Sequence, residues 1–163
     1  MLQEIQTGRE NKILRAHAQK VQTFNKKLTN LIRDLKETLI AAKGLGLAAP
    51  QIGLSQCVIV VKFQLPQNEN LLALVNPVIT QKSAEWERDL EGCLSLPNES
   101  GYVTRPKSVR VEFQNPQGQK TQIEFKDLNA RIVQHEIDHL KGILYTDYAA
   151  QIKSKKPAIN FSH

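Results

Sequence analysis

The chain has 163 residues, which fits one domain with a hydrophobic core of its own. No stretch approaches the roughly 18 consecutive apolar residues of a membrane span, and the N-terminus lacks the apolar middle of a signal peptide. The formal net charge of +6 is spread along the chain and predicts no specific DNA contact. We expect a cytoplasmic protein with one domain over 1–163, ending in a short basic tail at about 150–163.

The predicted order is one helix, then several strands, then a second helix, without regular alternation of strands and helices. Apolar residues at helical spacing predict an amphipathic helix over 25–43, which Gly44 ends. Strand-like runs follow at 57–63, 72–80, 108–114 and 121–126, and the turn sequence NPQG makes the last two a hairpin. A second helix is expected from about Asp127 to Lys141. This order predicts an α+β fold, with antiparallel or mixed sheets around that second helix.

The segment QHEIDHLKG in the second helix places two histidines four positions apart, with a glutamate directly after the first. On the predicted helix, His135 and His139 share one face with Leu128 and Ile132, so both imidazoles point into the protein. Two imidazoles at this spacing can hold one metal ion, and Glu136 can reach a water on it. This stretch alone leaves open a pair of hydrogen-bonded core histidines. The polar side of the helix consists of Arg131, Gln134 and Asp138.

A catalytic metal site needs a third protein ligand and an open position for water. The residues after the second helix offer no recognisable set of donors, so the third ligand is expected upstream. Cys93 in EGCLSLP is the best candidate, because a thiolate binds divalent metals strongly. A half-buried structural cysteine is the alternative reading of this segment.

A third segment, GLGLAAPQIG, consists of small residues and ends near Gln51. Its glycines allow another backbone to approach closely. It lacks the Lys-Ser/Thr pair of a phosphate-binding loop and does not lie between a strand and a helix, so nucleotide binding is not expected.

In this order the three segments resemble the peptide deformylase family, whose motifs are G-Φ-G-Φ-A-A-x-Q, E-G-C-Φ-S and H-E-Φ-D-H. Here they read GLGLAAPQ at 44–51, EGCLS at 91–95 and HEIDH at 135–139, with every fixed position present. The likeness runs from about residue 12 to residue 148. The opening segment GRENK and the sequence DYA after the third motif depart from the family pattern. These departures affect the prediction of subtype and surface contacts, but they do not affect the residues that carry the chemistry.

The resemblance implies a hydrolase that removes the formyl group from the N-terminal formylmethionine of new polypeptides and releases formate. It implies one divalent metal ion, natively Fe²⁺, with Ni²⁺, Co²⁺ or Zn²⁺ able to occupy the site in a purified sample. The implied metal ligands are Cys93, His135 and His139.

The resemblance also assigns the remaining site residues. Glu136 is expected to carry the proton, while the Gln51 amide and the backbone N–H of Leu94 donate to the oxyanion. Glu91 is expected to brace the site through Arg105, and Asp138 either bonds a ligand histidine or is solvated. The methionine pocket is expected to contain Leu45, Leu128 and Ile132, and the peptide backbone to meet Gly46 and Gly92.

The implied partners are nascent formylmethionyl peptides, with transient ribosome contact through the basic tail. The absence of a transit peptide favours a bacterial cytoplasm. A metallopeptidase using the same HExxH chemistry is the alternative enzyme, but it would need a ligand downstream of the second helix. A non-catalytic binding protein with this fold is the alternative from another class, and the intact motifs argue against it.

Overall fold

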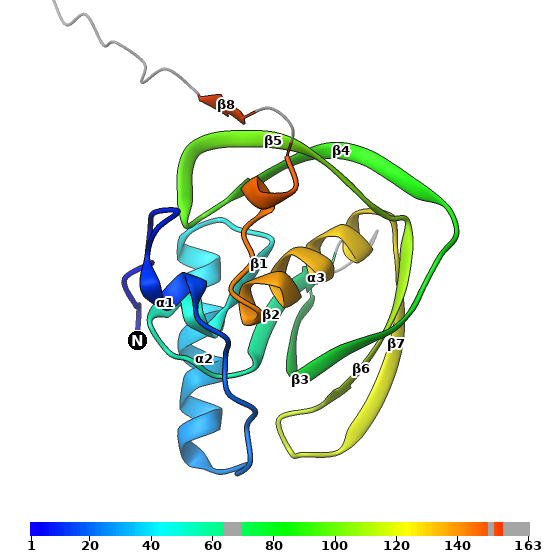
Figure 1. Ribbon diagram of the computed structural model, residues 1–163. Coiled ribbons are helices and arrows are strands. Elements are labelled where there is room, and N and C mark those ends of the chain that lie inside the picture. The colour runs from blue at the N-terminus through cyan, green and yellow to red at the C-terminus, as the bar shows by residue number, and fades with distance from the viewer. Residues whose placement is uncertain (64–69, 150–151, 155–163) are drawn as a thin grey trace, which may run out of the picture.

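The computed structural model describes residues 1–63, 70–149 and 152–154, which form two antiparallel β-sheets and three α-helices (Figure 1). The helices are α1 (Lys12–Arg15), α2 (Lys26–Ala41) and α3 (Asp127–Leu140), and single 3-10 turns cover Ala49–Ile52 and Tyr145–Asp147. The strands are β1 (Gly46–Ala48), β2 (Val58–Phe63), β3 (Asn70–Lys82), β4 (Trp86–Cys93), β5 (Leu96–Pro106), β6 (Ser108–Gln114), β7 (Lys120–Lys126) and β8 (Ile152–Ser154). The predicted α+β class is confirmed.

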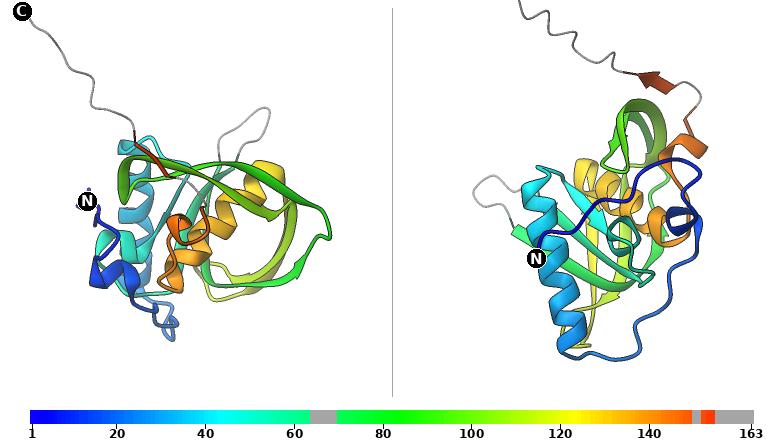
Figure 2. Two further views of the ribbon diagram at one scale, coloured as in Figure 1. Left: turned by 45° about the horizontal axis from the view of Figure 1, so that its top comes forward. Right: turned by 90° about the vertical axis from the view of Figure 1, so that its left-hand side faces the viewer.

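The predicted amphipathic helix forms as α2. Asn25 caps it, because its side chain accepts hydrogen bonds from the backbone N–H groups of Lys27 and Leu28. Leu35 and Leu39 are fully buried in a cluster that also contains Val58 and Val60 of β2. The helix therefore covers one face of the larger sheet, as the two views of Figure 2 show.

The larger sheet contains all four predicted strands, in the order β1-β2-β3-β6-β7. β6 and β7 form the predicted hairpin, with Ser108 opposite Lys126 and Gln114 opposite Lys120. β1 is a further strand of this sheet that was not predicted, because its residues were expected to lie in a loop. It is an edge strand, because only β2 pairs with it.

The smaller sheet, in the order β4-β5-β8, was not predicted. β4 reads WERDLEGC, and most of its side chains are exposed, so no apolar alternation marks it as a strand. Its pairing with β5 runs from Trp86 opposite Pro106 to a bulge just before Cys93. β8 lies within the expected basic tail and adds to β5. The rest of that tail, 150–151 and 155–163, lies outside the described residues.

The second predicted helix forms as α3 and lies between the two sheets (Figure 1). Val133 and Ile137 pack against the larger sheet in a cluster with Ile59 and Phe125. The expectation of a polar side for α3 needs correction, because the polar side chains do not lie in water. Arg131 and Gln134 are buried and Asp138 is largely covered, since β4 and β5 pack over that side.

Among the described residues, no helix has the length and apolar character needed to cross a membrane.

An ion pair joins the N-terminal part of the chain to the turn after α3. Arg15 Nη1 lies 2.7 Å from Asp147 Oδ2, and Nη2 donates to Oδ1 at 3.1 Å. The hydrogen bond from Arg15 lowers the pKa of the Asp147 carboxyl below its usual value. A carboxyl group whose pKa is lower in the folded than in the unfolded protein stabilises the fold at pH values above its pKa in the unfolded state. This stabilisation is lost as the pH falls through its pKa in the folded state.

We predict that Asp147→Asn lowers the free energy of unfolding by about 0.5–1 kcal/mol at neutral pH, as for other partly exposed pairs. The loss should shrink as the pH falls below about 4, the ordinary pKa of Asp, and on through the lower pKa of the folded Asp147 carboxyl. Urea unfolding at pH 7 and pH 3 measures this difference, with the exposed Glu4→Gln as control. An equal loss at both pH values would contradict the electrostatic origin.

Candidate metal centre and active site

The structure brings the three predicted metal ligands together. Cys93 ends β4, and His135 and His139 project from one face of α3. One donor atom from each of the three lies within 4.8 Å of the other two, and Cys93 Sγ is 3.3 Å from His139 Nε2. A thiolate and two imidazoles are a donor set for a soft or borderline divalent metal.

A nitrogen atom of each imidazole ring lies close to the Cys93 sulfur atom. His135 Nδ1 donates to Glu91 Oε2 at 2.9 Å, which leaves Nε2 free for a metal. Burial lowers the pKa of His139 well below its usual value, so this ring stays neutral. His139 Nδ1 has no hydrogen-bond partner in the described part of the chain. The residues present therefore fit a mononuclear metal site.

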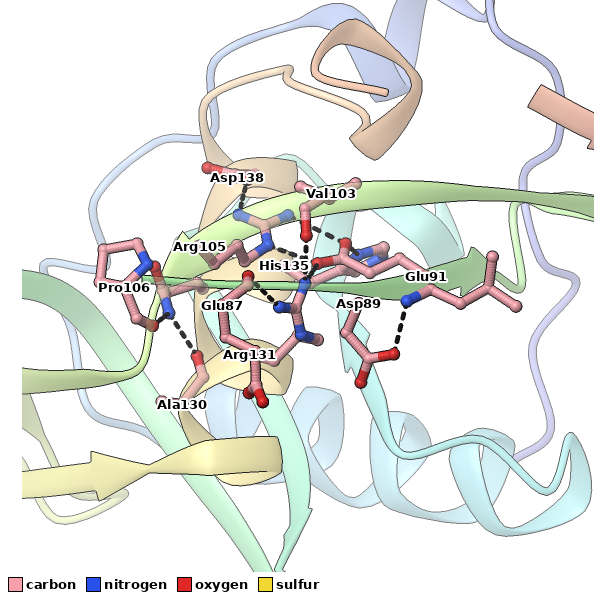
Figure 3. A network of polar contacts seen from close by, with 12 residues as sticks. Glu87, Asp89, Glu91, Val103, Arg105, Pro106, Ala130, Arg131, His135 and Asp138 are labelled. Carbon is pink, nitrogen blue, oxygen red and sulfur yellow. Dashed lines mark hydrogen bonds and ion pairs between the residues drawn. The ribbon is translucent and has the colours of Figure 1, made fainter. Parts of the chain in front are cut away.

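A buried ionic network surrounds Glu91 (Figure 3). Arg105 donates to both of its carboxylate oxygens, and Arg131 Nη1 donates to Oε1 at 2.9 Å. Burial alone would raise the pKa of Glu91, but the hydrogen bonds from His135 and Arg105 hold it at about 2. Glu91 is therefore an ionised carboxylate, and it contacts Arg105 as expected.

Neither expectation for Asp138 is correct. Its carboxylate lies 2.8 Å from Arg105 Nη1, so it extends the buried network and bonds no ligand histidine. Arg131 was not predicted as a site residue. It also donates to the backbone carbonyl groups of Val103 and Glu87, at 2.9 and 2.7 Å. Arg131 thus connects α3 to β4 and β5, the two strands that carry the network. The sequence did not predict this role, because Arg131 lies on the polar side of the helix.

Glu136 is the second carboxylate of the site, and its surroundings differ from those of Glu91. It is buried, and its Oε2 atom has no hydrogen-bond partner among the described residues. Burial raises its pKa to about 7. A β-carbon on Gly46 would clash with the Glu136 carboxylate, so the glycine makes room for it. Such a group can accept and return a proton near neutral pH.

The Gln51 amide is fixed in orientation at the 3-10 turn after β1. Its Oε1 accepts from the backbone N–H of Ala48 at 2.8 Å, and its Nε2 donates to Ser95 Oγ at 3.1 Å. Nε2 also lies 3.5 Å from Cys93 Sγ, so the NH₂ group faces the metal ligands. Gln51 thus braces the turn and presents a donor to the centre.

A cleft of about 340 Å³ opens beside these groups. Edge strands of both sheets line it, with Gly46 from β1 and Gly92 from β4. The other predicted substrate residues, Leu45, Leu128 and Ile132, line the same cleft, and so does Leu94, which was predicted to donate its backbone N–H to the oxyanion. Sequence reasoning missed Leu90 and Arg131, which also line it.

The segment before α1 was not predicted to reach the site, yet it supports two parts of it. Gln6 N–H donates to the Gln51 carbonyl at 2.8 Å, and Gly8 N–H donates to the Ser95 carbonyl at 3.0 Å. Nothing in the pattern of these polar residues marks such backbone contacts in advance. The segment holds the Gln51 turn and the β4–β5 turn in one arrangement.

Three convergent ligand atoms, an adjacent protonatable carboxylate and a peptide-sized cleft define a metal-dependent hydrolase. The polypeptide deformylase family model matches residues 3–155, and the chain belongs to this family. Its members remove the N-formyl group from newly made polypeptides.

Individual relatives agree with this assignment. A peptide deformylase from Natranaerobius thermophilus is 42% identical over 151 residues, which cover 93% of this chain and 94% of the relative. The structure is similar to a class I type b peptide deformylase from Acinetobacter baumannii, with a TM-score of 0.86, 35% identity, and coverage of 91% and 99%. The Met-Ala-Ser-bound structure of the Acinetobacter enzyme has a TM-score of 0.85 and 34% identity, and covers 91% of this chain and 98% of that one.

We predict that Glu91→Gln destabilises the fold by about 3–5 kcal/mol, because the buried Arg131 loses its counter-charge and the buried Arg105 keeps only Asp138. The neutral amide also holds His135 less firmly, so metal affinity should fall about 10- to 100-fold. Urea unfolding and metal competition with a chelator measure the two effects. Glu87→Gln on the same strand is the matched control, since that side chain is exposed. Wild-type stability in Glu91→Gln would contradict the prediction.

Proposed function

We propose that Cys93, His135 and His139 hold one divalent metal ion, and that Glu136 performs the proton transfers of deformylation. The observation that carries the proposal is the unpartnered Glu136 carboxylate beside three convergent ligand atoms. The domain responsible is proposed to span 1–163.

Held by Cys93, His135 and His139, a divalent ion would supply a nucleophilic water at neutral pH and would polarise the formyl carbonyl group. We propose Fe²⁺ as the native ion, following the family resemblance, and Ni²⁺, Co²⁺ or Zn²⁺ as ions that a purified sample can carry. The Cys93 thiolate and the two imidazoles accept each of these ions.

Glu136 takes the proton as the nucleophile attacks the formyl carbon, and then returns it to the departing amine. A pKa of about 7 suits both steps, because the group is a competent base and a competent acid at the same pH. The attack places negative charge on the formyl oxygen. The Gln51 amide and the backbone N–H of Leu94 donate to that oxygen, each worth about 3 kcal/mol of barrier in comparable sites.

The first residue of the substrate is proposed to occupy the apolar part of the cleft, between Leu45, Leu128 and Ile132. Gly46 and Gly92, on facing edge strands, then pair with the substrate backbone. Such strand addition binds a peptide through its main chain and sets few sequence demands. The Met-Ala-Ser tripeptide of the Acinetobacter structure has the form of a deformylated product, which supports a methionine-first substrate for this chain.

The proposed substrates are nascent formylmethionyl chains, which places the enzyme in a bacterial cytoplasm. Transient ribosome contact through the basic tail stays a prediction, as most of that tail lies outside the described residues. No role in membrane association or specific DNA binding is proposed.

We predict that Glu136→Gln lowers kcat for formate release from formyl-Met-Ala-Ser by about 10²- to 10⁴-fold, because the proton carrier is lost. Metal content should stay at the wild-type level, since Glu136 is not proposed as a ligand. The assay couples formate release to elemental analysis of the same sample, with Glu87→Gln as control.

Wild-type turnover in Glu136→Gln would remove Glu136 from the mechanism. Cleavage of unblocked peptides by the wild-type protein would favour a metallopeptidase, and a full metal site without any turnover would favour a binding protein.

We predict that iron-loaded protein loses deformylase activity in air, whereas nickel-loaded protein keeps it. Ferrous iron and the Cys93 thiolate are both open to oxidation by oxygen and peroxide. Formate release and Cys93 oxidation, followed by mass spectrometry, are measured over the same exposure, with anaerobic samples as control. Equal stability of the two loaded forms would contradict the assignment of iron as the oxygen-sensitive native ion.

A further inference from the structure

A ring of hydrogen bonds closes through the segment before α1. Gln6 N–H donates to the Gln51 carbonyl at 2.8 Å, and Gly8 N–H donates to the Ser95 carbonyl at 3.0 Å. The Gln51 side chain completes the ring, because its Nε2 donates to Ser95 Oγ at 3.1 Å. Gln51 and Ser95 are both almost fully buried. We call residues 6–8 the bridging segment, since their backbone spans these two buried residues.

The ring contains one proposed oxyanion donor and the residue next to the other. Gln51 Nε2 carries two hydrogen atoms, and Ser95 Oγ accepts one of them. The second is left for the formyl oxygen, on the side of the metal ligands, where Nε2 lies 3.5 Å from Cys93 Sγ. Leu94 is the other donor, and with Ser95 it makes up the turn between β4 and β5. The bridging segment therefore bonds the backbone at both donors' turns.

The two donors come from different sheets. Gln51 lies in the turn after β1 of the larger sheet, whereas Leu94 follows β4 of the smaller sheet. In the described part of the chain no strand pairing joins the two sheets, so the ladders do not fix the distance between the donors. The hydrogen-bond ring links the two turns directly. Donors to an oxyanion act best when they are in place before the charge develops.

Contacts away from the site hold the bridging segment from both sides. Gln3 N–H donates to Thr38 Oγ1 of α2 at 3.1 Å, and Arg9 Nη2 donates to Glu99 Oε2 of β5 at 2.9 Å. The right-hand view of Figure 2 shows the chain running from α2 towards the smaller sheet between these contacts. The segment is thus anchored independently of the two turns that it joins.

We propose that the bridging segment is a positioning element for deformylation, which sets the place of the Gln51 amide relative to the backbone N–H of Leu94. The inference rests on the proposed function, because it takes these two groups to donate to the formyl oxygen. Residues 6–8 are not among those that line the cleft or converge as metal ligands. A change in the segment therefore acts on an interaction made in the transition state, and leaves substrate and metal binding intact.

The test is Gln6→Pro, which removes the N–H that donates to the Gln51 carbonyl. In metal-loaded protein we expect kcat for formate release from formyl-Met-Ala-Ser to fall about tenfold to hundredfold, since outright loss of a donor costs about 10²- to 10³-fold. KM and metal content should stay at the wild-type level. Glu4→Pro is the matched control, because Glu4 is exposed and its N–H has no partner among the described residues.

A double-mutant cycle separates positioning from a general loss of structure. In the Gln51→Ala background the amide is absent, so Gln6→Pro should lower kcat no further. Ser95→Ala removes the acceptor that orients the same amide. It should lower kcat in the wild-type background alone, and it decides the proposal if Gln6→Pro does not fold.

Wild-type kcat in Gln6→Pro or, where that variant does not fold, in Ser95→Ala would overturn the proposal. So would an equal fall in both backgrounds, or a fall that follows a loss of bound metal. If the wild-type protein hydrolyses no formylated peptide, or Gln51→Ala leaves kcat unchanged, the proposed function of Gln51 fails. Hydrogen exchange of the Gln51 side-chain NH₂ group, measured by NMR on zinc-loaded protein, then decides the positioning separately. We expect exchange at least about tenfold faster in Gln6→Pro and unchanged in Glu4→Pro, and equal rates in both would overturn the proposal.

Discussion

The buried Glu91 carboxylate is the interaction on which the rest of the site depends. Arg105 from β5 and Arg131 and His135 from α3 all donate to it, so a single side chain of β4 joins three elements. Removing these charges from water is expensive, and only the complete set of partners offsets that expense. The network therefore requires β4, β5 and α3 to take one arrangement, and that arrangement places Cys93 opposite the histidines.

The two carboxylates of the site differ because their surroundings differ. Glu91 lies among cationic donors and has a pKa of about 2, whereas Glu136 is buried without such donors among the described residues and has a pKa of about 7. At neutral pH the first is a fixed negative charge, while the second can change its protonation state. This separation supports the proposed division of roles, with Glu91 orienting the site and Glu136 transferring the proton.

The parts of the fold with a regular apolar period were predictable from the sequence, and so were the three motifs. α2, the β6–β7 hairpin and α3 each bury aliphatic side chains at the expected spacing. β4 was missed because its buried side chain is Glu91, and β5 because only Leu96 and Val103 are buried aliphatic residues on it, beside the buried Arg105. A buried ion pair and two solvated charges look alike in a sequence, so Arg131 was also read as a polar surface residue.

The polar character that concealed β4 is consistent with its place at the edge of a sheet. One side of β4 pairs with β5, and no strand among the described residues pairs with its other side, where we propose that the substrate binds. An apolar strand with an open edge would invite pairing with other chains, whereas exposed charges such as Arg88 and Asp89 discourage it. Exposed charges of this kind let β4 keep an open edge, although Trp86 and Leu90 of the same strand are also exposed. Its backbone pairing with β5 and the partners of Glu91 hold β4 in place, since it has few apolar side chains to bury.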